Sequence, residues 1–186
     1  HITHMSIDVA HCRKLKVFEF LGNDDMTYPP TEVQARGQDG VLRYFRAIIA
    51  CETTNAMMLD DFDVSDVDLV IFKFPECTML DYSRNNLMKV PAELRQLNKI
   101  ESLNLSRNKL GAIPRVVSLM NLLTDLTIDS NGIENIEPSI KLLTGLTRLS
   151  LANNRIMHVH HSIFHLTSLI ILNLTNNKIE EVPDDV

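Results

Sequence analysis

Asparagine recurs at a fixed spacing of 23 residues through residues 77–186, and no other sequence feature constrains the fold so strongly. Apolar residues keep the same register, because they stand five and three residues before each asparagine and two and five residues after it. A single repeat cannot bury its own apolar face, so neighbouring repeats have to stack against one another. The repeated asparagines, which we expect to form a structural ladder, are Asn85, Asn108, Asn131, Asn154 and Asn177.

Each repeat divides into a strand and a return segment. Leu103 and Leu105 alternate with polar residues, which predicts a short strand with one buried face. Ile113, Val117 and Met120 follow at spacings of four and three residues, which predicts helical or 3₁₀ turns. An asparagine amide both donates and accepts hydrogen bonds, so stacked amides would satisfy backbone groups between repeats. The sequence therefore predicts an α/β solenoid with a curved parallel sheet on its concave side and helices or 3₁₀ turns on its convex side.

The pattern L-x-x-L-x-L-x-x-N-x-L resembles the leucine-rich repeat over residues 77–186, which would hold five repeats with the last truncated. The 23-residue length, and the proline that begins the return at Pro91 and Pro114, resemble the intracellular Ras-suppressor-like or Shoc-like type. Glu137 and His160 depart from this type, because they stand where the proline is expected. The resemblance implies a cytoplasmic, non-catalytic scaffold or adaptor that binds a protein partner on its concave face.

The first 51 residues divide into three expected parts. We expect residues 1–4 to be an expression-tag remnant. Residues 5–51 are expected to form a degenerate repeat, with Asn23 at its asparagine position, and an amphipathic cap helix with Asp39 as its N-cap. This part resembles the closing unit of intracellular leucine-rich-repeat arrays. Such units end repeat blocks in Roco-type proteins and separate two blocks in proteins like leucine-rich-repeat-containing protein 40.

Two regions leave alternatives open. Residues 52–76 are either an irregular acidic linker or a degenerate repeat with Val67 at the asparagine position, followed by the next repeat after only 18 residues. The chain stops at Val186 inside a repeat, without a polar cap. Because uncapped solenoid ends are poorly soluble, we expect a longer natural chain or self-association through exposed repeat ends.

The composition favours a soluble globular protein. Hydrophobic residues make up 45% of the chain, charged residues 23%, and the formal net charge is −6. The acidic balance argues against nucleic-acid binding, and no apolar run is long enough for a membrane span. Cys12, Cys51 and Cys77 are odd in number and widely spaced, which favours a reducing compartment.

Candidate catalytic and metal sites are weak. The sequence holds no phosphate-binding glycine motif and no G-x-S-x-G or H-E-x-x-H motif, so we expect no enzyme activity and no cofactor. An acidic run over residues 60–68 lacks the glycine and glutamate that a calcium loop of the EF-hand type requires. The weak candidate zinc ligands are His158, His160, His161 and His165, which by register point in several directions.

The concave face carries the functional hypothesis. Strand side chains alternate, so the register shows which residues point away from the core. This face is polar, with charges at its margins, which suits a polar and charged protein partner. The expected partner-binding residues are Asp81, Arg84, Asn104, Arg107, Lys109, Asp125, Asp129, Arg148, Arg155 and Lys178.

Two other functions stay open. The chain could be a structural or assembly module that positions neighbouring domains or self-associates through its ends. It could also be a fragment of an extracellular recognition receptor, since Asn104 and Asn173 begin glycosylation triplets.

Overall fold

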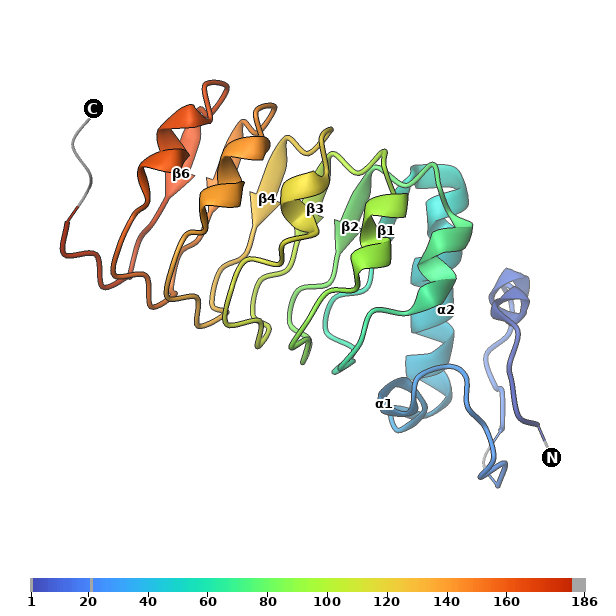
Figure 1. Ribbon diagram of the computed structural model, residues 1–186. Coiled ribbons are helices and arrows are strands. Elements are labelled where there is room, and N and C mark those ends of the chain that lie inside the picture. The colour runs from blue at the N-terminus through green and yellow to red at the C-terminus, as the bar shows by residue number, and fades with distance from the viewer. Residues whose placement is uncertain (1, 21, 182–186) are drawn as a thin grey trace.

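Six short parallel strands stacked in chain order form the sheet of this computed structural model, which describes residues 2–20 and 22–181 (Figure 1). Each strand pairs with the residues 23 positions further on, as where Leu103 lies opposite Leu126. The strands are β1 (Ala56–Met58), β2 (Met79–Asp81), β3 (Ser102–Asn104), β4 (Asp125–Thr127), β5 (Arg148–Ser150) and β6 (Ile171–Asn173).

Short 3₁₀ helices form the layer opposite the sheet, where the return segments run (Figure 1). The columns of leucine and isoleucine fill the space between the two layers; Leu80, Leu103 and Leu126 are almost completely buried. Burying one such side chain stabilises the fold by roughly 2 kcal/mol. The predicted α/β leucine-rich-repeat solenoid is confirmed. Its 3₁₀ helices are η2 (Leu69–Lys73), η3 (Ala92–Gln96), η4 (Val117–Leu119), η5 (Pro138–Leu142) and η6 (His161–His165), with η1 (Ile7–His11) near the N-terminus.

Two helices lie before the sheet: α1 (Thr31–Gln34) and α2 (Gly37–Thr54). Helix α2 packs against β1 and covers this end of the solenoid (Figure 1). Its buried side includes Phe45 and Ile48, as the helical period predicts. The predicted N-cap is wrong, because the helix begins at Gly37 and Asp39 lies in its first turn. Gly37 has a φ of 70°, which glycine adopts easily and which allows the chain to turn between the two helices. In the described residues, neither helix has the length and apolarity that a bilayer crossing needs.

The segment that follows α2 is a full repeat. Ala56 in β1 pairs with Met79 in β2, so the spacing to the next repeat is 23 residues, and the alternative with Val67 at the asparagine position after 18 residues is wrong. Phe62 stands at the asparagine position instead. Its ring packs edge-on against Tyr44 of α2, with 5.0 Å between ring centroids. Because a helix rather than a repeat precedes β1, the residue at this position faces the apolar side of α2, against which an aromatic ring packs well and an amide does not.

The N-terminal segment adds no described strand to the six-stranded sheet, yet Asn23 makes the local contacts of the repeat. Its Nδ2 group donates to Phe20 O at 2.8 Å, and its Oδ1 atom accepts from Ile2 N at 2.8 Å. These sequence offsets of 3 and 21 residues recur at the later asparagines. Met5 is only 5% exposed, and the His4 ring stacks on Tyr28 with 4.8 Å between centroids. Residues 2–4, expected to be part of a tag remnant, are exposed but hydrogen-bond to or stack on residues 23–28, whereas His1 lies outside the described residues.

The three cysteines differ in accessibility. Cys12 is exposed, whereas Cys51 and Cys77 are buried. Burial raises the pKa of the Cys77 thiol to about 12 and also raises the pKa of Cys51, so little reactive thiolate forms at either position. A chromogenic disulfide reagent should therefore react with one thiol of the folded chain within minutes and with three after denaturation. Rapid reaction of all three thiols in the folded chain would contradict this packing.

Candidate functional site

The asparagine that follows each of strands β2 to β6 binds the backbone of its own repeat and of the preceding repeats. Asn154 Nδ2 donates to Ile128 O and Leu151 O, both at 2.9 Å. Its Oδ1 atom accepts from Asn131 N at 2.9 Å and from Ile133 N at 3.1 Å. A buried amide with all of these bonds has no capacity left for a partner, so its role is structural. Equivalent donor and acceptor contacts are made by Asn85, Asn108, Asn131 and Asn177.

The side chains of the strands that point away from the core, here called the strand face, bind one another. Asn104 Nδ2 donates to Asp81 Oδ2 at 2.9 Å. Asp129 Oδ1 accepts from Ser150 Oγ at 2.7 Å and from Ala152 N at 2.8 Å. Three of the expected partner-binding residues, Asp81, Asn104 and Asp129, therefore already bind the array itself.

Two of the expected arginines are paired with carboxylates on the preceding repeat. Arg148 Nη1 lies 2.6 Å from Asp125 Oδ2, and Arg84 pairs with Asp60. More than half of each arginine side chain is exposed, so these pairs contribute at most about 1 kcal/mol to stability. Each pair places opposite charges side by side, so neither arginine presents an isolated positive charge on the strand face.

A second set of cations has no ion-pair partner among the described residues. Lys109, Arg155 and Lys178 stand at the same position of three repeats, on the turn after the strand. Their backbone N–H groups donate to Leu87 O, Ile133 O and Ile156 O of the preceding repeat, which places them in one row. Arg107 lies two residues before Lys109. Within residues 2–20 and 22–181, no carboxylate is in ion-pairing distance of these four exposed side chains, here called the turn cations.

The acidic run binds the cap helix and the neighbouring repeat. Arg36 stands just before α2, and its Nη2 atom lies 2.5 Å from Asp63 Oδ2 and 3.8 Å from Asp61 Oδ1. Lys89 lies 3.6 Å from Asp66 in the preceding repeat. Asp60 is the partner of Arg84, so the run serves contacts between elements.

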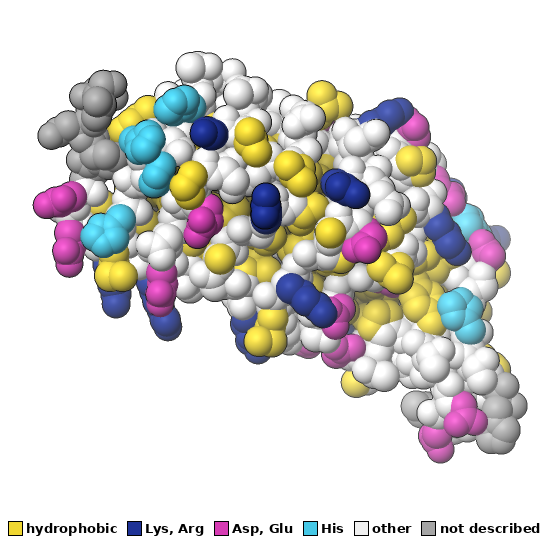
Figure 2. All heavy atoms as spheres, in the orientation of Figure 1, with side chains coloured by type: hydrophobic (Ala, Val, Ile, Leu, Met, Phe, Trp, Pro, Cys, Tyr) yellow, Lys and Arg dark blue, Asp and Glu magenta, His cyan; other side chains and the backbone are white. Residues whose placement is uncertain are grey.

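The four histidines gather at the C-terminal end of the convex side, which Figure 2 shows. His160 takes the proline position and caps η6, since its Nδ1 atom accepts from Ser162 N at 3.1 Å. The ring centroids of His160 and His161 lie 4.2 Å apart. Across the part of the chain that the structure describes, no three metal-ligating side chains are placed to hold one ion, so the weak zinc candidate gains no support.

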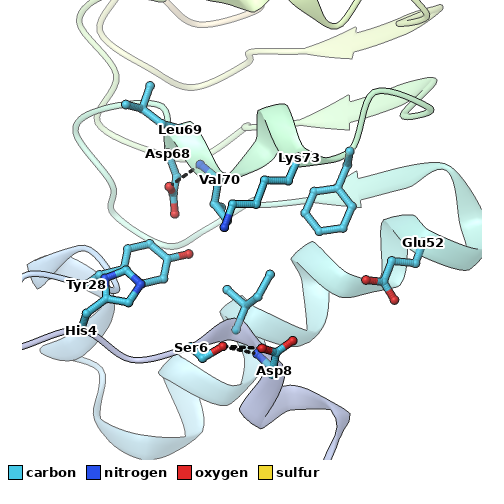
Figure 3. A pocket seen from close by; sticks show the side chains of 11 residues that line it. His4, Ser6, Asp8, Tyr28, Glu52, Asp68, Leu69, Val70 and Lys73 are labelled. Atoms are coloured by element: carbon cyan, nitrogen blue, oxygen red, sulfur yellow. Dashed lines mark hydrogen bonds between the residues drawn. The ribbon is translucent and has the colours of Figure 1, made fainter. Parts of the chain in front are cut away.

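The sequence did not indicate a pocket of about 640 Å³ between the N-terminal segment and the first repeat (Figure 3). Tyr28 and Lys73 point into it, and Asp68 lies above it. Asp68 accepts from Tyr44 Oη at 2.7 Å and from Val70 N at 2.9 Å. Burial and the Asp68 charge raise the pKa of Tyr28, whose hydroxyl is buried and has no hydrogen-bond partner among the described residues. The sequence signal that could have placed the N-terminal segment beside the first repeat is the spacing of 21 residues between Ile2 and Asn23. At this spacing a backbone N–H group donates to the amide oxygen of the asparagine, as it does in the later repeats.

Comparisons with known proteins support the repeat. The leucine rich repeat family matches residues 121–179. A Leptospira interrogans leucine-rich-repeat protein is 26% identical, with 65% of this chain and 31% of that chain covered and a TM-score of 0.62. An internalin from Listeria monocytogenes is 22% identical, with 66% and 34% covered and a TM-score of 0.58. The plant peptide hormone receptor RGFR1 in complex with RGF2 is 28% identical, with 61% and 19% covered and a TM-score of 0.53.

No curated protein sequence matches the chain. The aligned region spans about a third or less of the length of these solved structures. The 23-residue period, the parallel sheet and the similar solved structures together show a leucine-rich-repeat solenoid fold, and the family match covers residues 121–179 of the chain.

Proposed function

We propose that the chain is a non-catalytic scaffold or adaptor that binds a protein partner on its strand face. Leucine-rich-repeat folds generally serve as protein-interaction modules, and one similar structure is a peptide hormone receptor in complex. The observation that carries the proposal is the row of exposed turn cations beside a polar strand face whose other charged side chains bind within the array. Unpaired charges at the margin of an interface guide partner orientation and raise the association rate.

The type of leucine-rich-repeat protein and its location are part of the proposal. We place the chain with the intracellular Ras-suppressor-like type, in the cytoplasm, on the evidence of its repeat length, Pro91, Pro114 and its three free cysteines. The extracellular alternative requires a glycan on Asn104 or Asn173. Asn104 is only partly exposed and its amide binds Asp81, so a glycan there would break a strand-face contact. An intact-mass measurement on protein from the native source tests this point.

Reversing the charge of two turn cations tests the interaction. We expect the double variant Lys109→Glu and Arg155→Glu to weaken partner binding by about tenfold or more, since each change replaces an attraction by a repulsion. The partner is first captured from lysate of the source cell, identified by quantitative mass spectrometry and then titrated as a purified protein.

The matched control changes two exposed cations on 3₁₀ helices, Arg95→Glu and Lys141→Glu, and alters the net charge equally. Both double variants must melt like the wild type. If the two variants bind the partner equally well, the strand-face proposal fails. Unchanged capture combined with concentration-dependent assembly of all three proteins would favour the structural module instead.

A further inference from the structure

Two buried cysteines from different elements meet where α2 covers the sheet. Cys51 lies in the last turn of α2, and Cys77 lies two residues before β2. Both belong to the same core cluster, and the two thiols lie close enough for each to affect the pKa of the other. In the following repeats, the column of Cys77 holds Ile100, Leu123, Leu146 and Leu169.

The backbone of Asn55 holds the two cysteines in place. Asn55 ends α2 with a φ of 53°, and its N–H group donates to Cys51 O at 3.0 Å. Its carbonyl oxygen accepts from Thr78 N at 2.7 Å and from Met79 N at 3.2 Å, directly after Cys77. One residue therefore fixes the end of the helix and the beginning of β2 at the same point, and both side chains enter the core there.

We propose that Cys51 and Cys77 form an intramolecular disulfide site that fastens α2 to the first two repeats when a low-molecular-weight disulfide is present. One thiolate attacks a sulfur of oxidised glutathione, which gives a mixed disulfide and releases one reduced glutathione. The thiolate of the second cysteine then attacks the protein sulfur of that mixed disulfide. The cysteines become linked and the second glutathione leaves, so that the two protons of the protein thiols end on the two released glutathione thiols.

Burial decides when this exchange proceeds. The folded chain shields both thiols, so the exchange requires the end of α2 to open, or takes place during folding. In a reducing compartment the site stays as two thiols. Once formed, the bond closes a loop from residue 51 to residue 77 in the unfolded chain, and we expect it to raise the melting temperature by roughly 10 °C.

The test uses the full chain with Cys12→Ser, which removes the exposed thiol. One sample is dialysed from denaturant into a mixture of reduced and oxidised glutathione, and another into a buffer with excess dithiol. We expect the oxidised sample to lose two thiols, to yield one peptide pair joined through Cys51 and Cys77, and to melt higher. The added dithiol should return the melting temperature to that of the reduced sample.

Two further variants distinguish the effect of the disulfide on the melting temperature from the effect of the redox buffer. With Cys51→Ala or with Cys77→Ala in the same background, the oxidised and reduced samples should melt at the same temperature. The proposal is overturned if both thiols stay free, if each carries glutathione, or if the joined chain melts no higher than the reduced chain.

Discussion

Replacing Phe62 by asparagine should destabilise the chain strongly, although asparagine is the residue that the repeat pattern places there. Phe62 is almost completely buried, packs edge-on against Tyr44 and lies under the guanidinium of Arg43, which is 4.6 Å from the ring centroid. Truncating a buried phenylalanine costs about 3–5 kcal/mol, and an amide at this position would face the apolar side of α2. We expect a loss of roughly 4 kcal/mol, measured by urea unfolding followed by circular dichroism.

Phe164→Asn is the matched control for this substitution. Phe164 lies on η6 and is 45% exposed, so the same chemical change there should alter the free energy of unfolding by well under about 1 kcal/mol. Equal stability of Phe62→Asn and the wild type would mean that α2 does not pack on the first repeat in solution.

The second large effect is expected at Asn154. Its replacement by alanine removes five hydrogen bonds and takes this partner from Ile128 O and from the N–H groups of Asn131 and Ile133 in the preceding repeat. Leu151 O and Ala152 O keep their bonds to Asn177 Nδ2 and Ser130 N. A single buried polar group without a partner costs about 1–3 kcal/mol, and water reaches part of the vacated space, so we expect a total loss of about 3 kcal/mol. The measurement is the midpoint and slope of urea unfolding.

Two variants check the cause. Asn154→Asp keeps the acceptor and loses the donor, so it should be at least as destabilising, because it also buries a charge. Asn121→Ala changes an exposed asparagine outside the ladder and should have an effect within about 0.5 kcal/mol. If Asn154→Ala behaves like Asn121→Ala, the amide ladder is not a source of stability.

The charges of the strand face were only partly predictable. Asp125 and Arg148 occupy the same column of adjacent repeats, so the register alone makes them neighbours. Whether their side chains pair depends on rotamers and on competing partners, which the period does not specify. The same limit applies to Asp129, whose carboxylate binds Ser150 and Ala152.

The repeat period determined the solenoid, its buried columns and the positions of the ladder asparagines, because stacked repeats place residues 23 positions apart side by side. The N-terminal end was decided by tertiary structure. Tyr44 lies on α2, outside the 23-residue period, so no sequence register relates it to Phe62 and Asp68 of the first repeat. Their packing depends on how α2 covers the first repeat, and this contact between unlike elements also brings Cys51 and Cys77 together.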